Sequence, residues 1–236
     1  MNADQLAAAP LWYVVFLLST TCHEAAHALA AKIGGDDTAA LGGQVTLNPV
    51  PHIQREPFGM VLVPLLSLAL GGVMFGWASA PYDPRWRQRY PHRAAWMAAA
   101  GPAANFILVL IAAAAIHIGI GMGAFEMPVS PNFTALVNPL GGEWTEGLGT
   151  ALSILFSLNL LLGAFNLLPV PPLDGATVIG LFMSEEQALR AWAFLHQPQF
   201  GMIGLLLAWY VFGEIFYPIF HTAIGLLYPS AAWVVS

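Results

Sequence analysis

Long apolar segments with almost no charge constrain this chain more than any other feature. Charged residues make up 8% of its 236 residues and hydrophobic residues 58%, whereas soluble domains carry about a quarter charged residues. Runs of about 20 apolar residues are long enough to cross the hydrocarbon core of a bilayer. The sequence therefore predicts an all-α integral membrane protein, a multi-helix transmembrane bundle formed by one membrane-embedded domain over residues 1–236.

Five membrane-embedded segments are expected. They cover about residues 10–33, 58–80, 94–120, 147–168 and 200–228. Four of them have the length and composition of membrane-spanning helices. The second is also free of charge, but Pro64, Gly71, Gly72 and Gly76 interrupt it. Between the first two segments, Gly42-Gly43, a short β-prone run and Asn48-Pro49 predict a small β-hairpin or edge strand.

The basic residues predict how the chain is oriented, because cytoplasmic loops carry an excess of Lys and Arg. With the N-terminus outside, the cytoplasmic side holds Lys32, Arg55, Arg190 and the four arginines between residues 85 and 93. The acidic loop 121–146 then lies outside. The 58–80 segment must begin and end on the cytoplasmic side, which favours a re-entrant hairpin, or a helix with an extended return, over the simpler single crossing.

His23 and His27 form the strongest candidate site. Four residues apart on a helix, they project from the same face, one turn apart. Two imidazoles at that spacing can share one zinc ion, and Glu24 beside them can act on water as general base. Ionisable groups inside a membrane segment usually serve a function, so packing is the weaker explanation. Cys22 is better explained as a small apolar helix residue than as a ligand.

Asp174 is the expected third ligand, since a catalytic zinc ion takes three protein ligands and keeps one position open. It follows Pro169, Pro171 and Pro172, which stop a helix from continuing. A carboxylate at such a break suits a polar cavity. In the orientation above, His27 and Asp174 both lie near the cytoplasmic ends of their segments, so the active site is expected towards the cytoplasm.

Three stretches together resemble the site-2 protease family of intramembrane zinc metalloproteases: His23 to His27, Gly101 to Asn105, and Asn166 to Gly175. The 47–53 stretch is similar to that of small prokaryotic members without a PDZ domain. The resemblance covers about residues 10–185, shows no departure at the ligand positions, and includes no PDZ-sized insertion. It implies a multi-pass protein of the inner cell membrane, with a membrane-associated β-hairpin at residues 42–53 near the substrate.

The resemblance also implies the roles of the site residues. His23, His27 and Asp174 would bind one Zn²⁺ per chain, and Glu24 would activate water. Asn166 would hold the substrate backbone or the developing oxyanion. The implied activity is hydrolysis of peptide bonds within or near the transmembrane segments of single-span membrane proteins, in regulated intramembrane proteolysis.

A transmembrane substrate must unwind locally before it can be cut. An exposed strand edge at Val45, Thr46 and Leu47 could hold the unwound part by strand addition. His52 is a further candidate for substrate contact, with a histidine facing water as the alternative. The lipid bilayer is an expected partner; nucleic acid is not, because the chain has no basic stripe.

Three other functions compete with this one. A prenyl-protein endopeptidase would also use a His-Glu-x-x-His helix, but the proline-rich segment that ends in Leu173-Asp174-Gly175 does not fit it. A membrane zinc transporter would need a continuous polar path, whereas the ionisable groups here converge on one side. A non-catalytic binding protein would be favoured if Glu24 or a ligand were missing, and all are present.

Overall fold

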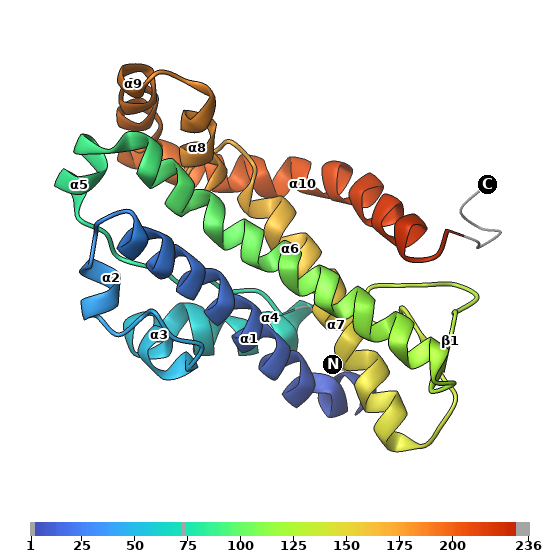
Figure 1. Ribbon diagram of the computed structural model, residues 1–236. Coiled ribbons are helices and arrows are strands. Elements are labelled where there is room, and N and C mark those ends of the chain that lie inside the picture. Colours follow the sequence, from blue (N-terminus) through green and yellow to red (C-terminus); the bar gives the residue numbers. More distant parts are fainter. Residues whose placement is uncertain (1–2, 72–73, 230–236) are drawn as a thin grey trace.

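The protein is an all-α membrane bundle, described by a computed structural model over residues 3–71 and 74–229 (Figure 1). Four of the described helices are long and apolar enough to cross a bilayer. They are α1 (Ala3–Ile33), α6 (Pro91–Gly121), α7 (Glu143–Asn166) and α10 (Pro198–Leu227). Their bounds agree with the four expected membrane helices to within a few residues, apart from α1, which begins earlier.

Helices α1, α6 and α7 pack against one another, and α10 packs mainly on α7. One buried cluster joins α1 to α7 through Trp12, Phe16 and Leu158. Another joins α6, α7 and α10 through residues such as Ile116 and Phe156. Large apolar side chains such as those of Ile107, Leu110 and Ile118 are exposed along α6, as expected where a helix faces lipid.

Short helices connect the long ones. They are α2 (Thr38–Leu41), α3 (Pro49–Arg55), the π-helical η1 (Phe58–Leu62), α4 (Val63–Gly71), α5 (Pro84–Arg89), α8 (Gly175–Val178), the 3-10 helix η2 (Ile179–Phe182) and α9 (Glu185–Leu195). Local sequence starts several of them. Asn48 and Asp83 accept the N–H groups of Val50 and Arg85 at the starts of α3 and α5, and Ser184 forms a capping box on α9. Such caps satisfy N–H groups that have no partner inside the helix.

The 58–80 segment has the predicted form of a helix with an extended return. η1 and α4 bend away from α3 by 114°, and residues 74–83 then run back without regular structure. Phe75 N donates to Ser67 Oγ at 3.0 Å, and Trp77 N donates to Gly59 O at 3.1 Å. Ser79 Oγ finally donates to the Glu56 carboxylate at 2.5 Å. The segment therefore begins and ends at the same end of the bundle.

The small β-hairpin exists, but its predicted place at residues 42–53 is wrong. Its strands are β1 (Phe125–Glu126) and β2 (Asn138–Pro139), which pair antiparallel in the loop between α6 and α7. Residues 45–47 form bends, and α3 follows them. Asn48-Pro49 signals a turn, but the same pair also starts a helix, because Asn48 caps it and proline is well tolerated at the first position.

Candidate metal centre

His23 and His27 of α1 meet Asp174 inside the bundle. The Nε2 atoms of the two histidines lie 2.9 Å apart, as their spacing on one helix face predicts. Asp174, from the turn that precedes α8, places Oδ2 3.1 Å from His23 Nε2 and 3.3 Å from His27 Nε2. Both histidines are buried. Residues far apart in the sequence thus aim three donor atoms at one point.

Glu24 completes the group. Its carboxylate and the two imidazoles each offer a ligand atom, and these atoms all lie within 4.8 Å of one another. The Glu24 side chain is buried, and its Oε2 has no hydrogen-bond partner. A buried carboxylate oxygen without a partner is unfavourable unless a proton, a water or a cation is provided for it.

The spacing of the three donor atoms suits a zinc ion. In a tetrahedral site with bonds of about 2.0–2.2 Å, donor atoms lie about 3.3–3.6 Å apart. Two observed separations, 2.9 and 3.1 Å, are slightly shorter, and the third, 3.3 Å, lies at the lower limit of this range. A small outward movement of the side chains would therefore give bonding geometry, and the two nitrogens and one oxygen are the ligand types that catalytic zinc uses.

The hydrogen bonds of His27 fix which of its nitrogens faces the site. Its Nδ1 lies 2.7 Å from the backbone carbonyl oxygen of Met97 on α6. A carbonyl oxygen can only accept, so Nδ1 must carry the proton. The neutral ring then presents the bare lone pair of Nε2 to the site, which is the form that binds a metal.

His23 is oriented by a chain of buried amides. Asn159 Nδ2 donates to Leu155 O and to Ser19 Oγ, both at 2.8 Å. Asn159 Oδ1 therefore accepts from Asn105 Nδ2 at 2.8 Å, and Asn105 Oδ1 faces His23 Nδ1 at 2.6 Å. Since the Leu155 carbonyl can only accept, every orientation in this chain is determined, and His23 Nδ1 carries a proton.

The Nε2 atoms of two imidazoles and a carboxylate oxygen therefore converge on one point. Three such acceptor atoms repel one another unless protons or a metal ion lie among them. Asn105 of α6 thus contacts both Asn159 of α7 and His23 of α1. Neither Asn159 nor Ser19 was singled out from the sequence; the available signal was polar side chains within otherwise apolar segments.

Gly101 lets α6 pass close to the site. A Cβ atom at this position would lie 2.3 Å from His27 Nε2 and 2.5 Å from His23 Nε2. Any side chain would therefore occupy the space of the imidazoles. Gly101 and Asn105 lie one helical turn apart, so this stretch of α6 both makes room for the site and orients one of its histidines.

The Asp174 segment is a tight turn. α7 ends at Asn166, and a Cβ atom on Gly175 would lie 2.3 Å from the carbonyl oxygen of Leu168. The backbone N–H groups of Thr177 and Val178 donate to Asp174 O at 2.8 and 2.9 Å. The proline-rich break predicted from the sequence therefore does place a carboxylate at the end of a membrane helix, opposite the histidines.

Comparison with known proteins identifies the family to which these residues belong. The family model for Peptidase family M50 matches residues 11–203, which is most of the chain. The chain belongs to peptidase family M50, the site-2 protease family. It is therefore a membrane metalloprotease, and several apolar helices make this M50 protein a multi-pass membrane protein.

Curated relatives carry matching names. The "Putative zinc metalloprotease YwhC" of Bacillus subtilis is 36% identical over 175 residues, covering 74% of this chain and 69% of the relative. The "Putative zinc metalloprotease Rip2" of Mycolicibacterium smegmatis is 29% identical, covering 76% and 62%. Rip2 of Mycobacterium tuberculosis H37Rv is 28% identical, covering 81% and 63%. The chain thus spans less than two thirds of the Rip2 proteins, and no solved structure matches it. A zinc metalloprotease family implies zinc, and His23, Glu24 and His27 could hold it.

The structure places the predicted substrate residues of this M50 protein in two regions. Val45, Thr46 and Leu47 line a groove of about 350 Å³ beside α1 and α6. Its other lining residues are mostly apolar and include neighbours of the site residues: Cys22, Ala25, Ala26, Leu29, Ala104, Ile107 and Leu108. Asn166 lies at the end of α7, half-buried, and its amide nitrogen donates to Leu162 O at 3.0 Å.

His52 does not face water, so that alternative is wrong. The side chain is buried with 1% of its surface exposed, and Nε2 lies 3.1 Å from the carbonyl oxygen of Thr46. The reason is that α3 packs its inner face against α1. His52 therefore braces the bent segment that carries Thr46.

Proposed function

We propose that this protein is an intramembrane zinc metalloprotease that hydrolyses peptide bonds within or near the transmembrane segments of single-span membrane proteins. One zinc ion per chain would be held by His23, His27 and Asp174. The observation that carries the proposal is the convergence of two imidazole Nε2 atoms and a carboxylate oxygen, at 2.9 to 3.3 Å, beside a buried Glu24 that has an unpartnered oxygen.

Glu24 is the proposed general base. A zinc ion at this site supplies Lewis acidity, which lowers the pKa of water towards about 7 and polarises a peptide carbonyl. Glu24 takes a proton from the attacking water as its oxygen forms a bond to the carbonyl carbon. Glu24 then delivers that proton to the leaving amine as the carbon–nitrogen bond breaks. The side chain thus ends the cycle in its starting form.

The 45–47 segment is the proposed place for the unwound substrate. Among the described residues, Val45 and Leu47 use neither their N–H nor their C=O in a backbone hydrogen bond. Free backbone groups beside a groove can bind an extended peptide by strand addition. The groove itself is apolar and suits the side chains of a membrane segment. Residues 45–47 form bends, so strand addition would require this segment to become extended when the substrate binds.

We further propose that the N-terminus lies outside the cell membrane and that the site opens towards the cytoplasm. Support comes from where the basic residues gather. Arg93 Nη1 donates to Gly34 O at the end of α1 at 3.0 Å, close to Lys32, and Arg55 Nε donates to Ser79 Oγ at 3.1 Å. The acidic loop lies at the other end of α6, where β1 is labelled (Figure 1).

Cleavage of a model single-span substrate by the purified protein in detergent tests the proposed function. The parent protein and Glu24→Gln should each contain one zinc ion, and only the parent should cleave. Glu143→Gln, at the start of α7 at the far end of the bundle, is the matched control and should cleave like the parent. Cleavage by Glu24→Gln at the parent rate would refute the role of Glu24.

A further inference from the structure

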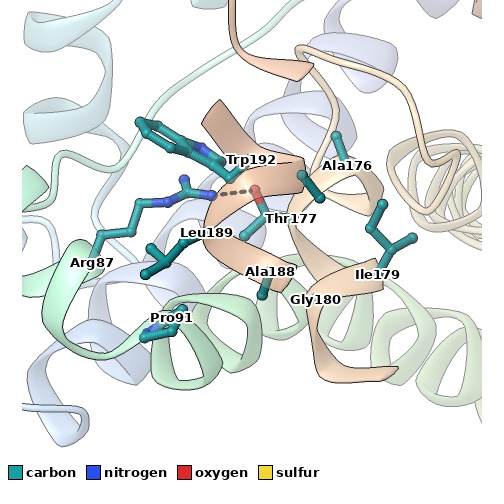
Figure 2. Close-up of a pocket in the computed structure, with 10 residues that line it drawn as sticks. Arg87, Pro91, Ala176, Thr177, Ile179, Gly180, Ala188, Leu189 and Trp192 are labelled. Carbon is teal, nitrogen blue, oxygen red and sulfur yellow. Dashed lines mark hydrogen bonds between the residues drawn. The ribbon is translucent and has the colours of Figure 1, made fainter. Parts of the chain in front are cut away.

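Arg87 is buried on the side of the bundle from which Asp174 reaches the site. It belongs to α5 and is only 5% exposed. Its guanidinium carbon lies 3.9 Å from the centre of the Trp192 ring on α9 (Figure 2). Nη2 donates to Thr177 Oγ1 on α8 at 3.3 Å, and Nη1 donates to Tyr82 Oη at 3.1 Å. Arg87 therefore links α5 to α8 and α9.

This arginine has no carboxylate partner among the described residues, since none lies within 4.0 Å of it in an ion pair. Burial lowers the pKa of its guanidinium, which is what desolvation of a cation does. The cavity beside it, lined by Thr177 and Trp192 among others, has about 10 Å³, room for about one water. The cation is therefore stabilised by its ring stack and hydroxyl contacts rather than by a counter-ion.

The contact with Thr177 reaches Asp174 through one helical turn. Thr177 N donates to Asp174 O at 2.8 Å, so the two residues move together. The Asp174 side chain makes no capping hydrogen bond of its own, and α8 has four residues. A turn this short has little rigidity of its own. Its place must be set by what it packs against, and Arg87 contacts both α8 and α9.

We propose that Arg87 is a positioning residue that holds α8, and through it Asp174, at ligand distance from His23 and His27. The inference rests on the proposed role of Asp174 as a zinc ligand. The sequence indicates only that the four arginines between residues 85 and 93 mark the cytoplasmic side. The proposal gives one of them, Arg87, a role at the metal site. Arg89, two residues later, is exposed and lies over Tyr90 at 5.4 Å, and it is the natural control.

The test compares zinc affinity, by chelator competition, and the visible absorption of the cobalt-substituted protein. Arg87→Ala should weaken zinc binding about 10-fold, at the lower end of the range for residues that support ligands, and should change the cobalt spectrum. Arg87→Lys keeps the charge but neither the planar stack nor the fork of donors, so it should rescue little. Arg89→Ala should match the parent in both readouts.

Thr177→Val provides a milder variant in case Arg87→Ala does not fold. Losing one hydrogen bond should weaken zinc binding about fivefold and shift the cobalt spectrum in the same direction. Parent-like affinity and spectra in Thr177→Val and in any folded Arg87 variant would overturn the role of Arg87 and leave the metal site standing. A parent protein that binds neither metal would overturn the site itself, and this inference with it.

Discussion

Asn105 offers the sharpest perturbation of the metal centre, because it touches His23 without being a ligand. Asn105→Leu keeps the approximate size of the side chain and removes the oxygen that lies 2.6 Å from His23 Nδ1. The imidazole then loses the partner that fixes its proton and its orientation. Loss of such a supporting contact typically weakens metal binding 10- to 100-fold, about 1.4–2.8 kcal/mol.

The same substitution leaves Asn159 Oδ1 buried without its donor. Asn105 and Asn159 are both fully buried, so metal-free Asn105→Leu should be destabilised by about 1–3 kcal/mol. A second substitution separates the two effects. Asn105→Leu combined with Asn159→Leu removes the acceptor that the single variant leaves without a donor, and should therefore recover part of the stability. His23 Nδ1 still lacks its acceptor in the double variant. Zinc affinity should stay low in the double variant.

The assays are zinc affinity by chelator competition and thermal unfolding of the chelated protein in detergent. The expected pattern is low affinity in both variants and lower stability in the single variant than in the double variant. Parent-like affinity in Asn105→Leu would refute the claim that this amide orients His23. Affinity that returns together with stability in the double variant would show that the loss came from general destabilisation.

Three further outcomes follow from the same structure. Gly101→Ala puts a methyl group against both imidazoles and should lower zinc affinity about 10- to 100-fold. Gly121→Ala on the same helix has open space around it and should leave zinc affinity unchanged. Parent-like zinc affinity in Gly101→Ala would contradict the close approach of α6 to the two imidazoles. Thr46→Pro removes an N–H beside the groove and should impair cleavage while zinc content is kept. Thr46→Ala keeps the N–H and is the control. Loss of zinc in Thr46→Pro would indicate that Thr46 has a role in folding instead. Burial, with a smaller effect of Arg87, lowers the pKa of His196 to about 4, so as the pH falls from about 6.5 this histidine takes up a proton in the unfolded chain before it does so in the folded protein. The free energy of unfolding should therefore decrease between pH 6.5 and 4, and should decrease less in His196→Gln. Equal pH profiles for the two proteins would count against this reasoning.

The sequence predicts the parts of this site that depend on local geometry. The spacing of His23 and His27 determines a shared helix face, and three prolines determine the break that carries Asp174. Both predictions hold in the structure, because helix periodicity and proline geometry act over a few residues. The re-entrant segment followed from the positions of the charges at its two ends.

The sequence does not predict which buried polar groups meet. Asn105 and Asn159 lie on different helices, and only the packing of α6 against α7 brings them together. Arg87 looks like its neighbours in sequence, yet its helix turns it onto Trp192 while Arg89 remains exposed. The β-hairpin was predicted in the wrong place because Asn48-Pro49 is compatible both with a turn and with the start of a helix, and the packing of α3 decides between them.

The most direct test of the central claim is X-ray absorption at the zinc edge of the purified protein. The account predicts one zinc ion per chain with only nitrogen and oxygen neighbours, at about 2.0–2.2 Å, including two imidazoles. Asp174→Asn should alter the oxygen contribution and keep the two imidazoles. A sulfur neighbour at about 2.3 Å, which only Cys22 or a methionine could supply, or protein without zinc, would contradict the ligand set proposed here.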